Sequence, residues 1–419
     1  MAANSVVTPT WVMKKIGQRL VNNIRFGNNV DRSYSDEFRQ AGAKVGYTVN
    51  ARLPQRYQVN KGQALNPQAV VDNIVPITLT DQANIGLEFS MASLTMEVDN
   101  YREKCIEPAV DALINQCDYD GLTRMYKAVN MTVGTPAVIP GSTGTLPFAA
   151  NIVYQAAVVK LAKVGMDTSN LIGMIDPNAQ SYLAAANQAI FNPVADISKL
   201  WRKGQFGGEA LGVSKWFMSQ NVAAHVVGPL GGTALIDGIP TEGSAAILTK
   251  SWTAAAANRL LEGDVVQFAG CYAINRVNYQ STGQLMDFTV TADTSSTSGG
   301  ALTIPIAPAM ITTGALATCS ALPADSAAVT IFGHASSYAN AITPQGLVYD
   351  KGAFALVFAD LEKPGGLWVA ERISNRALGI AVRFLKDYSI MTDQSPARVD
   401  LLYGWKAVRP YEMACRVCT

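Results

Sequence analysis

The sequence predicts an α+β protein whose mixed helical and stranded part is interrupted by an all-β domain. Apolar residues follow one helix face from about Asp99 to Val129, and alternating residues predict strands on both sides of that helix. From about Gly228 to Gln345 the chain consists of short alternating runs separated by turn residues, which is typical of a small barrel or sandwich. Because helix and strand patterns resume after this region, it is predicted to be an insertion.

Length and composition bound the class of protein. The chain has 419 residues, enough for two or three domains, and 49% of them are hydrophobic, which excludes global disorder. Only 16% are charged, against a typical value of about 25%. Such a low fraction fits a surface that is covered by neighbours, and it also fits an Ala- and Gly-rich domain with neutral loops. The net charge of +1 provides no basic excess for neutralising phosphates. The protein is therefore expected to enclose a nucleic acid rather than to bind it tightly.

The first predicted element is an amphipathic helix in an N-terminal arm. Thr8-Pro9 is typical of a helix start, since Thr can cap the first turn and Pro fits its first position. Apolar side chains then recur every four residues and form one face: Val12, Ile16, Leu20 and Ile24. The same pattern fits an ordinary surface helix, and the sequence leaves both interpretations open.

A long hairpin is predicted next. Residues 45–53 alternate between apolar and polar side chains, and so do residues 77–89. The segment 54–73 between them is polar, with a turn signal at Lys61-Gly62. An isolated two-stranded hairpin is marginally stable in water, so this one is expected to rest on another surface.

The helix from Asp99 to Val129 would extend roughly 45 Å. Pro108 lies inside it and is predicted to kink or locally break it, because proline lacks an amide donor and clashes with the preceding turn. The segment from Gly134 to Pro147 is rich in glycine and proline and is predicted to be a loop at a domain boundary.

A compact α/β layer follows from Ala149. Its predicted elements are a helix over 152–163, a strand over 171–175, a helix after Asp176-Pro177 and an extended run over 212–222. Three strands are predicted after the insertion, over 353–358, 378–385 and 401–408.

No pattern of an active site or metal centre is found. His225 and His334 lie in no HExxH pattern, and the chain has no GxSxG elbow. Cys415 and Cys418 have the spacing of half a zinc or redox pair, but no second pair follows, which favours two small residues of a terminal strand. With no signal peptide and six scattered cysteines, free thiols in a reducing compartment are expected. The prediction is a non-enzymatic protein with no catalytic residues, no metal and no cofactor.

The order of these parts resembles the major capsid (coat) proteins of tailed bacteriophages, which have the HK-97-type fold. The all-β insertion resembles that of the P-22-type coat protein family, which carries an inserted β-barrel domain. Local segments are similar too, including TPTWVMKKIGQRLVNN at the start, EGDVVQFAGCYAINRVNYQSTGQLMDFTVTAD in the insertion and RVDLLYGWKAVRPYEMACRV at the end. The resemblance covers essentially the whole chain.

The resemblance implies six segments. They are an N-terminal arm (1–40), an extended loop with its base strands (41–98), a peripheral domain with a spine helix (99–148), the first part of an axial domain (149–227), an inserted β-barrel domain (228–345) and the completion of the axial and peripheral domains (346–419).

The resemblance also implies a major capsid protein that self-assembles as hexamers and pentamers into the icosahedral head around the double-stranded DNA of a phage. Scaffolding and portal proteins are the implied partners, decoration proteins are further candidates, and no membrane or sequence-specific DNA binding is expected. Assembly would occur in the bacterial cytoplasm, and the inserted barrel would act as a folding nucleus and a lateral contact.

Interface residues are expected on the hairpin, where Arg52, Arg56 and Lys61 could meet acidic surfaces of a neighbouring copy. Pro108 is the expected flexible element. Two alternatives stay open: another structural virion protein, such as a tail-tube or decoration subunit, and a cytosolic α/β enzyme with a β accessory domain.

Overall fold

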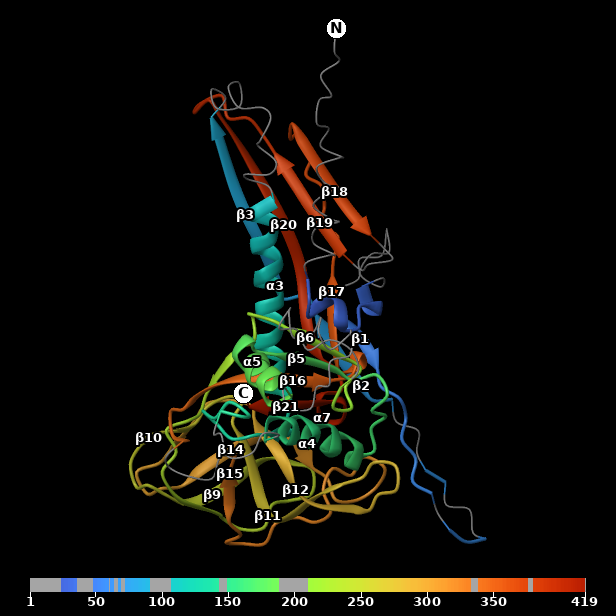
Figure 1. The fold of residues 1–419 in the computed structure, drawn as a ribbon, viewed down its shortest axis with the longest axis vertical. Coiled ribbons are helices and arrows are strands. Elements are labelled where there is room, and N and C mark those ends of the chain that lie inside the picture. Colours follow the sequence, from blue (N-terminus) through green and yellow to red (C-terminus); the bar gives the residue numbers. More distant parts are fainter. Residues whose placement is uncertain are drawn as a thin grey trace. The chain divides into compact units, whose positions relative to one another are not determined.

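The computed structural model divides the chain into two compact units (Figure 1). Unit 1 contains residues 1–53, 74–121 and 354–408, and unit 2 contains residues 54–73, 122–353 and 409–419. The structure describes residues 24–35, 48–59, 61–63, 67–68, 72–90, 107–142, 149–187, 210–332, 338–375 and 380–418. The predicted helix of the N-terminal arm lies outside the described residues, apart from its last apolar position.

Unit 1 is built on a sheet of strand order β17-β20-β19-β18, and β3 pairs with β20 as well. β17 is buried along its whole length, which fits its apolar sequence FALVF. The strands are β3 (Asp81–Ser90), β17 (Phe354–Phe358), β18 (Val369–Asn375), β19 (Ile380–Lys386) and β20 (Gln394–Ala407).

The predicted hairpin is present but shorter than expected. β1 (Thr48–Arg52) and β2 (Ile74–Thr78) pair antiparallel, with Thr48 opposite Thr78. The alternating residues that follow form β3, and this strand lies against β20 instead of extending the hairpin. Alternation identifies a half-buried strand but not its partner, so the sequence could not separate the two.

The long helix is α3 (Glu107–Ala128). Pro108 is its second described residue. The predicted first turns, residues 99–106, lie outside the described residues, so the kink stays a prediction. Further along, the Trp405 indole donates a hydrogen bond of 3.1 Å to the Cys117 carbonyl.

Asp118 of α3 is buried and anchors the chain that follows the N-terminal arm. Its carboxylate accepts backbone N–H bonds from Arg25 at 2.8 Å, Phe26 at 3.2 Å and Gly27 at 3.1 Å. These donors lead into the short 3-10 helix η1 (Gly27–Asn29), which begins at Gly27. Burial raises the pKa of Asp118, while the three donors oppose that rise.

Unit 2 contains a sheet of strand order β4-β21-β16-β5-β6, with β7 pairing on β16. Its core includes Tyr154 and Trp216, whose rings meet edge to face at 5.3 Å. The elements are β4 (Thr132–Val133), α4 (Ala149–Val164), β5 (Ile172–Ile175), α5 (Pro177–Asn187), β6 (Lys215–Met218), β7 (Ala224–Val226), β16 (Ile342–Tyr349), η5 (Lys351–Ala353), α7 (Pro410–Met413) and β21 (Ala414–Cys418).

Between β7 and β16 the chain forms the all-β insertion. Six strands follow the order β15-β11-β12-β14-β9-β8. A bridge between Leu235 and Ala328 joins the two ends of this sheet, and the Ile236 N–H donates to Ala327 O at 3.0 Å. The sheet therefore forms a nearly closed barrel. Its strands are β8 (Gly232–Ile236), β9 (Ser244–Trp252), β11 (Val265–Ile274), β12 (Ser281–Val290), β14 (Leu302–Met310) and β15 (Val329–Ile331), and β10 (Ala257–Leu260) pairs with β13 (Thr294–Ser296) beside them.

The barrel has its own hydrophobic core, which is distinct from the core formed by α4 and the sheet of strand order β4-β21-β16-β5-β6. Phe268 and Phe288 lie at its centre, with ring centroids 5.5 Å apart. β16 begins at Ile342 and already belongs to the sheet of unit 2, so the returning strand starts before residue 345. The limits of the other predicted segments stay predictions.

Candidate assembly interface

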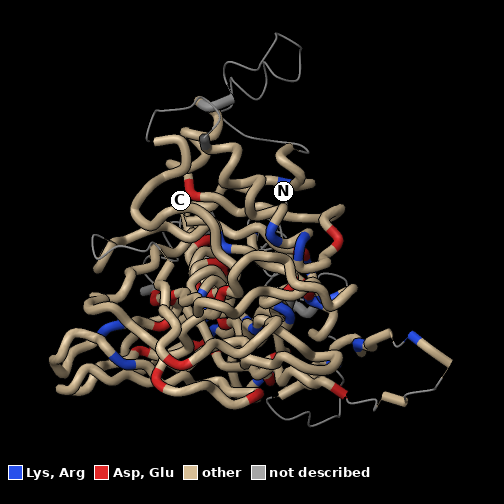
Figure 2. The backbone as a smooth tube through the Cα atoms, turned by 90° about the horizontal axis from the view of Figure 1, so that it is seen from below, with Lys and Arg blue, Asp and Glu red and all other residues tan. Residues whose placement is uncertain are grey.

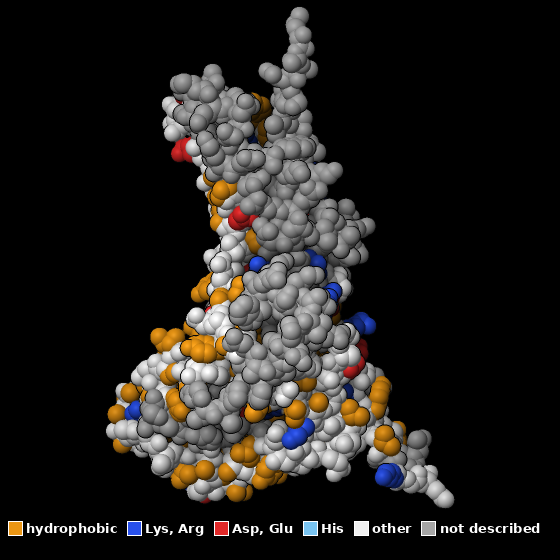
Figure 3. Space-filling view, viewed as in Figure 1, with side chains coloured by type: hydrophobic (Ala, Val, Ile, Leu, Met, Phe, Trp, Pro, Cys, Tyr) orange, Lys and Arg blue, Asp and Glu red, His pale blue; other side chains and the backbone are white. Residues whose placement is uncertain are grey.

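The loop between β1 and β2 exposes both apolar and basic side chains (Figure 3). Tyr57 is 56% exposed and Val59 is 86% exposed. Lys61 is exposed as well, and so is Arg52 at the end of β1. Large apolar side chains on such a surface are typical of a binding site for another protein.

Arg56, the third basic residue of this loop, is engaged within its own chain. It forms an ion pair with Glu412 of α7, whose carboxylate also lies 2.5 Å from the Arg276 guanidinium. Burial, reinforced by the neighbouring Arg56 charge, lowers the pKa of Arg276 to about 9, so Arg276 stays charged at neutral pH. Of the three predicted interface charges, the structure leaves two exposed and pairs one.

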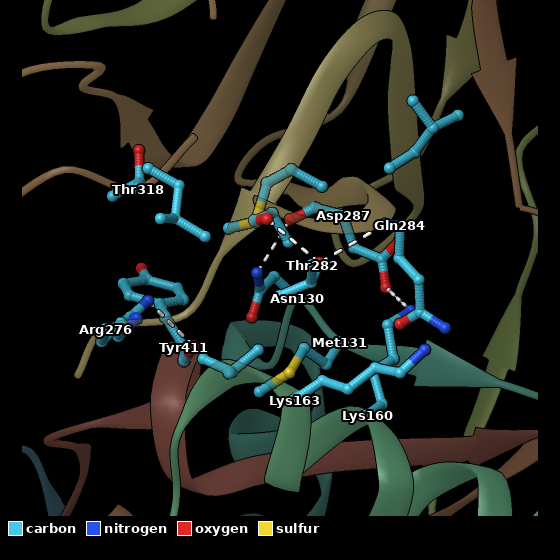
Figure 4. Close-up of a pocket in the computed structure, with 15 residues that line it drawn as sticks. Asn130, Met131, Lys160, Lys163, Arg276, Thr282, Gln284, Asp287, Thr318 and Tyr411 are labelled. Carbon is cyan, nitrogen blue, oxygen red and sulfur yellow. Dashed lines mark hydrogen bonds and ion pairs between the residues drawn. The ribbon is translucent and has the colours of Figure 1, made fainter. Parts of the chain in front are cut away.

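The barrel is fastened to the rest of unit 2 by a buried polar network around Asp287 of β12 (Figure 4). The Asp287 carboxylate forms an ion pair with Lys160 of α4. It also accepts the Thr132 N–H at 3.1 Å and the Gln267 side-chain amide at 2.6 Å. The Asn130 side chain donates to the Asp287 carbonyl at 2.8 Å. One residue of the barrel, through its side chain and its carbonyl, thus accepts hydrogen bonds from α4, β4 and the segment between α3 and β4.

Further hydrogen bonds extend this contact, which we call the seam. Thr289 donates to the Lys127 carbonyl at 2.8 Å, and the Asn275 amide donates to the Lys163 carbonyl at 2.9 Å. A cavity of about 20 Å³ beside the seam has room for roughly one water, far below the size of a metabolite pocket. The seam is therefore polar, whereas the cores on its two sides are apolar.

Sequence reasoning missed Asp287. The signal was present in the run MDFTV, where the polar residues Asp287 and Thr289 alternate with the apolar residues of a half-buried strand. Residues 286–290 are all buried, so the outward side of β12 is covered too. Which element covers it depends on residues more than a hundred positions away, and no local pattern could show that.

His225 lies at the start of the insertion and pairs with Asp264. The ring Nε2 is 2.9 Å from the carboxylate, and Nδ1 is 3.3 Å from the Tyr126 hydroxyl. Asp264 also accepts hydrogen bonds from the N–H groups of Gly228 at 3.1 Å and Leu261 at 2.8 Å. It thus links the segment that enters the barrel to the residues that follow β10. His334 lies outside the described residues, among which no metal-ligating cluster of three His, Cys, Asp or Glu is found.

Cys415 and Cys418 both lie in β21, and the sequence favoured such a terminal strand for them. Three residues apart in a strand, their side chains point to opposite faces, so they cannot form half of a zinc or redox site. Burial raises the pKa of Cys415 to about 12, so its thiol is protonated at neutral pH.

The charged residues show no concentration of one sign. Lys and Arg are interspersed with Asp and Glu along the described chain (Figure 2). Among the described residues, no helix is both long enough and apolar enough to cross a membrane.

Comparison with known proteins identifies the family. The family described as "P22 coat protein - gene protein 5" matches residues 1–416. No curated protein matches the chain. A structure from Mycobacterium phage Che8 is 12% identical, covers 94% of this chain and 90% of its own, and has a TM-score of 0.49.

Two further solved structures are similar. The mature capsid of bacteriophage PhiM1 is 11% identical over 94% of this chain and 86% of its own, with a TM-score of 0.42. The CUS-3 coat protein I-domain is 25% identical over 24% of this chain and 96% of its own, with a TM-score of 0.18. Because the family match spans nearly the whole sequence, the chain belongs to the P22 coat protein family and is a major capsid protein that forms the shell of a phage virion.

Proposed function

We propose that this coat protein closes its shell through the loop between β1 and β2, which binds a neighbouring copy. The carrying observation is that Tyr57, Val59 and Lys61 are exposed on a loop whose two strands pair mainly with each other. Burying these side chains on a neighbour would add apolar contact and charge complementarity at little cost to the isolated subunit.

The rest of the proposal follows from the family. Hexamers and pentamers build an icosahedral head in the host cytoplasm, with a scaffolding protein and a portal, around double-stranded DNA that is held without sequence recognition. The protein has no enzymatic role. The inserted barrel nucleates folding and forms a lateral contact between capsomers, and its self-contained core supports the first of these roles.

The test is charge reversal on the loop. The double variant Arg56→Glu/Lys61→Glu is expected to fold as a monomer but to yield few closed shells by negative-stain microscopy with scaffold. Arg56→Glu also places a carboxylate beside Glu412, so Lys61→Glu alone is the cleaner variant. Lys351→Glu, on the exposed side of η5, is the matched control and should assemble normally.

The same micrographs decide between the alternatives. Normal shell yield from Lys61→Glu and from the double variant would refute the loop contact. Tubes or rings from the unmodified protein would instead indicate a tail component. Turnover of a small molecule by a stable monomer would indicate an enzyme.

A further inference from the structure

Two cysteines meet inside the inserted barrel. Cys271 of β11 and Cys319, which precedes β15, are both fully buried in the barrel core. Ala273 lies opposite Cys319, and Ser320 N–H donates to Tyr272 O at 2.9 Å. Since Cys271 and Ala273 lie on the same face of β11, Cys271 is the diagonal neighbour of Cys319.

The two thiols are neighbours in the barrel core. The Cys271 S–H donates to the Cys319 sulfur, which raises the pKa of Cys271 and lowers that of Cys319. The Cys319 sulfur lies 3.8 Å from the Ile311 carbonyl, which fixes its orientation. β11 is irregular between Gln267 and Tyr272, with Gly270 at φ +85°, so the strand can adjust where a disulfide would draw it inward.

We propose that Cys271 and Cys319 form an oxidisable pair that is cross-linked by a disulfide when the protein meets a small peroxide. Cys319 loses its proton as its sulfur attacks one peroxide oxygen, becomes a sulfenic acid, and releases water. The Cys271 sulfur then attacks the sulfenic sulfur, the S–S bond forms and a second water leaves. Two thiols and one hydrogen peroxide thus give one disulfide and two waters.

The pair suits a protein that is made in one redox environment and persists in another. In the reducing cytosol both thiols stay free and the barrel folds without a covalent constraint. A particle outside its host meets oxidants, and a bond between β11 and the segment before β15 would close a long loop of the barrel. Closing a long loop restricts the unfolded chain, so the barrel is expected to melt several degrees higher after oxidation.

The test uses the full-length protein, both as monomer and in assembled shells. Native material is treated with hydrogen peroxide, unreacted thiols are alkylated under denaturing conditions, and peptides are mapped without reduction. The expected result is a peptide pair joined through Cys271 and Cys319, with a mass 2 Da below the sum of the two free peptides. The melting temperature should rise, and a reductant should reverse both changes.

Matched variants separate the pair from the other thiols. Cys415→Ala removes a buried cysteine that lies in β21, outside the barrel, and the cross-link should still form. Cys319→Ser keeps a small hydrogen-bonding side chain and should leave Cys271 fully alkylated. Complete alkylation of both cysteines in peroxide-treated wild type, or sulfinic acid without a cross-link, would overturn the proposal whether or not the variants fold.

Discussion

At the residue scale, the ion pair between Lys160 and Asp287 is the most consequential contact of the seam. The Asp287 side chain is fully buried, and its charge is compensated by the paired Lys160, by two neutral donors and by the Coulomb attraction of the Arg416 guanidinium. Lys160→Met would remove the cation that forms an ion pair with this carboxylate. We expect a loss of about 3 kcal/mol in the free energy of unfolding, at the lower end of what breaking a buried pair costs.

Urea unfolding of the monomer measures this loss. Lys163→Met, one helical turn further along α4 and exposed, is the matched control and should change stability by less than about 0.5 kcal/mol. The double variant Lys160→Met/Asp287→Asn removes both charges and should recover part of the loss. A Lys160→Met protein as stable as the wild type would show that the ion pair is not needed to hold Asp287.

Contacts between individual residues were the feature that the sequence predicted least well. Lys61 and Arg52 could be expected on an exposed hairpin, and the structure exposes both. The partner of Arg56 is Glu412, at the other end of the chain, and no spacing rule links two such positions. Which residues meet in an ion pair is decided by tertiary structure, which the local pattern does not contain.

At the element scale, helix α3 depends on a glycine in its interior. Gly121 has no side chain where the Trp405 ring lies, and a Cβ at this position would come within 2.5 Å of two ring atoms. Helix propensity alone favours Gly121→Ala by about 1 kcal/mol. The clash dominates, because the ring cannot move without losing its hydrogen bond to Cys117. We therefore expect a net loss of about 2 kcal/mol.

The urea midpoint of Gly121→Ala measures that balance. Gly86→Ala on β3 is the control, since a Cβ there meets nothing within 4 Å, and it should be neutral or slightly stabilising. Adding Trp405→Ala to Gly121→Ala should cost less than the sum of the single changes. A stabilised Gly121→Ala protein would mean that propensity outweighs packing here.

Elements were predictable where their pattern was long and regular. The helix α4 and the all-β character of the insertion follow from periodicity, and the structure confirms both. The length of the hairpin did not follow, because β2 and β3 carry the same alternation and differ only in their partners. β18 was missed because its sequence VAERISN is largely polar and does not alternate strictly.

At the scale of the whole molecule, two carboxyl groups on barrel loops, Asp325 and Glu242, make the stability of the fold depend on pH in the acidic range. The Gly238 N–H and Lys250 hold the pKa of Asp325 at about 2, and hydrogen bonds from Thr312 lower the pKa of Glu242. A depressed carboxyl pKa stabilises the fold above the unfolded value of about 4. That contribution is lost as the pH falls from about 4 towards 2.

Thermal unfolding of the full-length protein between pH 5 and pH 2.5 checks this linkage. The melting temperature of the wild type should fall more steeply with acid than that of Asp325→Asn, which has no such carboxyl to protonate. Other carboxyl groups contribute equally to both proteins, so the difference isolates this group. Parallel curves would exclude a contribution of Asp325 in this range.

The nearly closed ring of barrel strands, whose ends meet at Leu235 and Ala328, affects how the protein behaves at high concentration. An open six-stranded sheet would offer a row of unpaired amide and carbonyl groups along each outer strand, and identical subunits crowded into a growing particle would stack through them into aggregates. Here the two outer edges meet at this bridge, so fewer of these groups are free and many copies can be brought together with less backbone-mediated aggregation between their barrels.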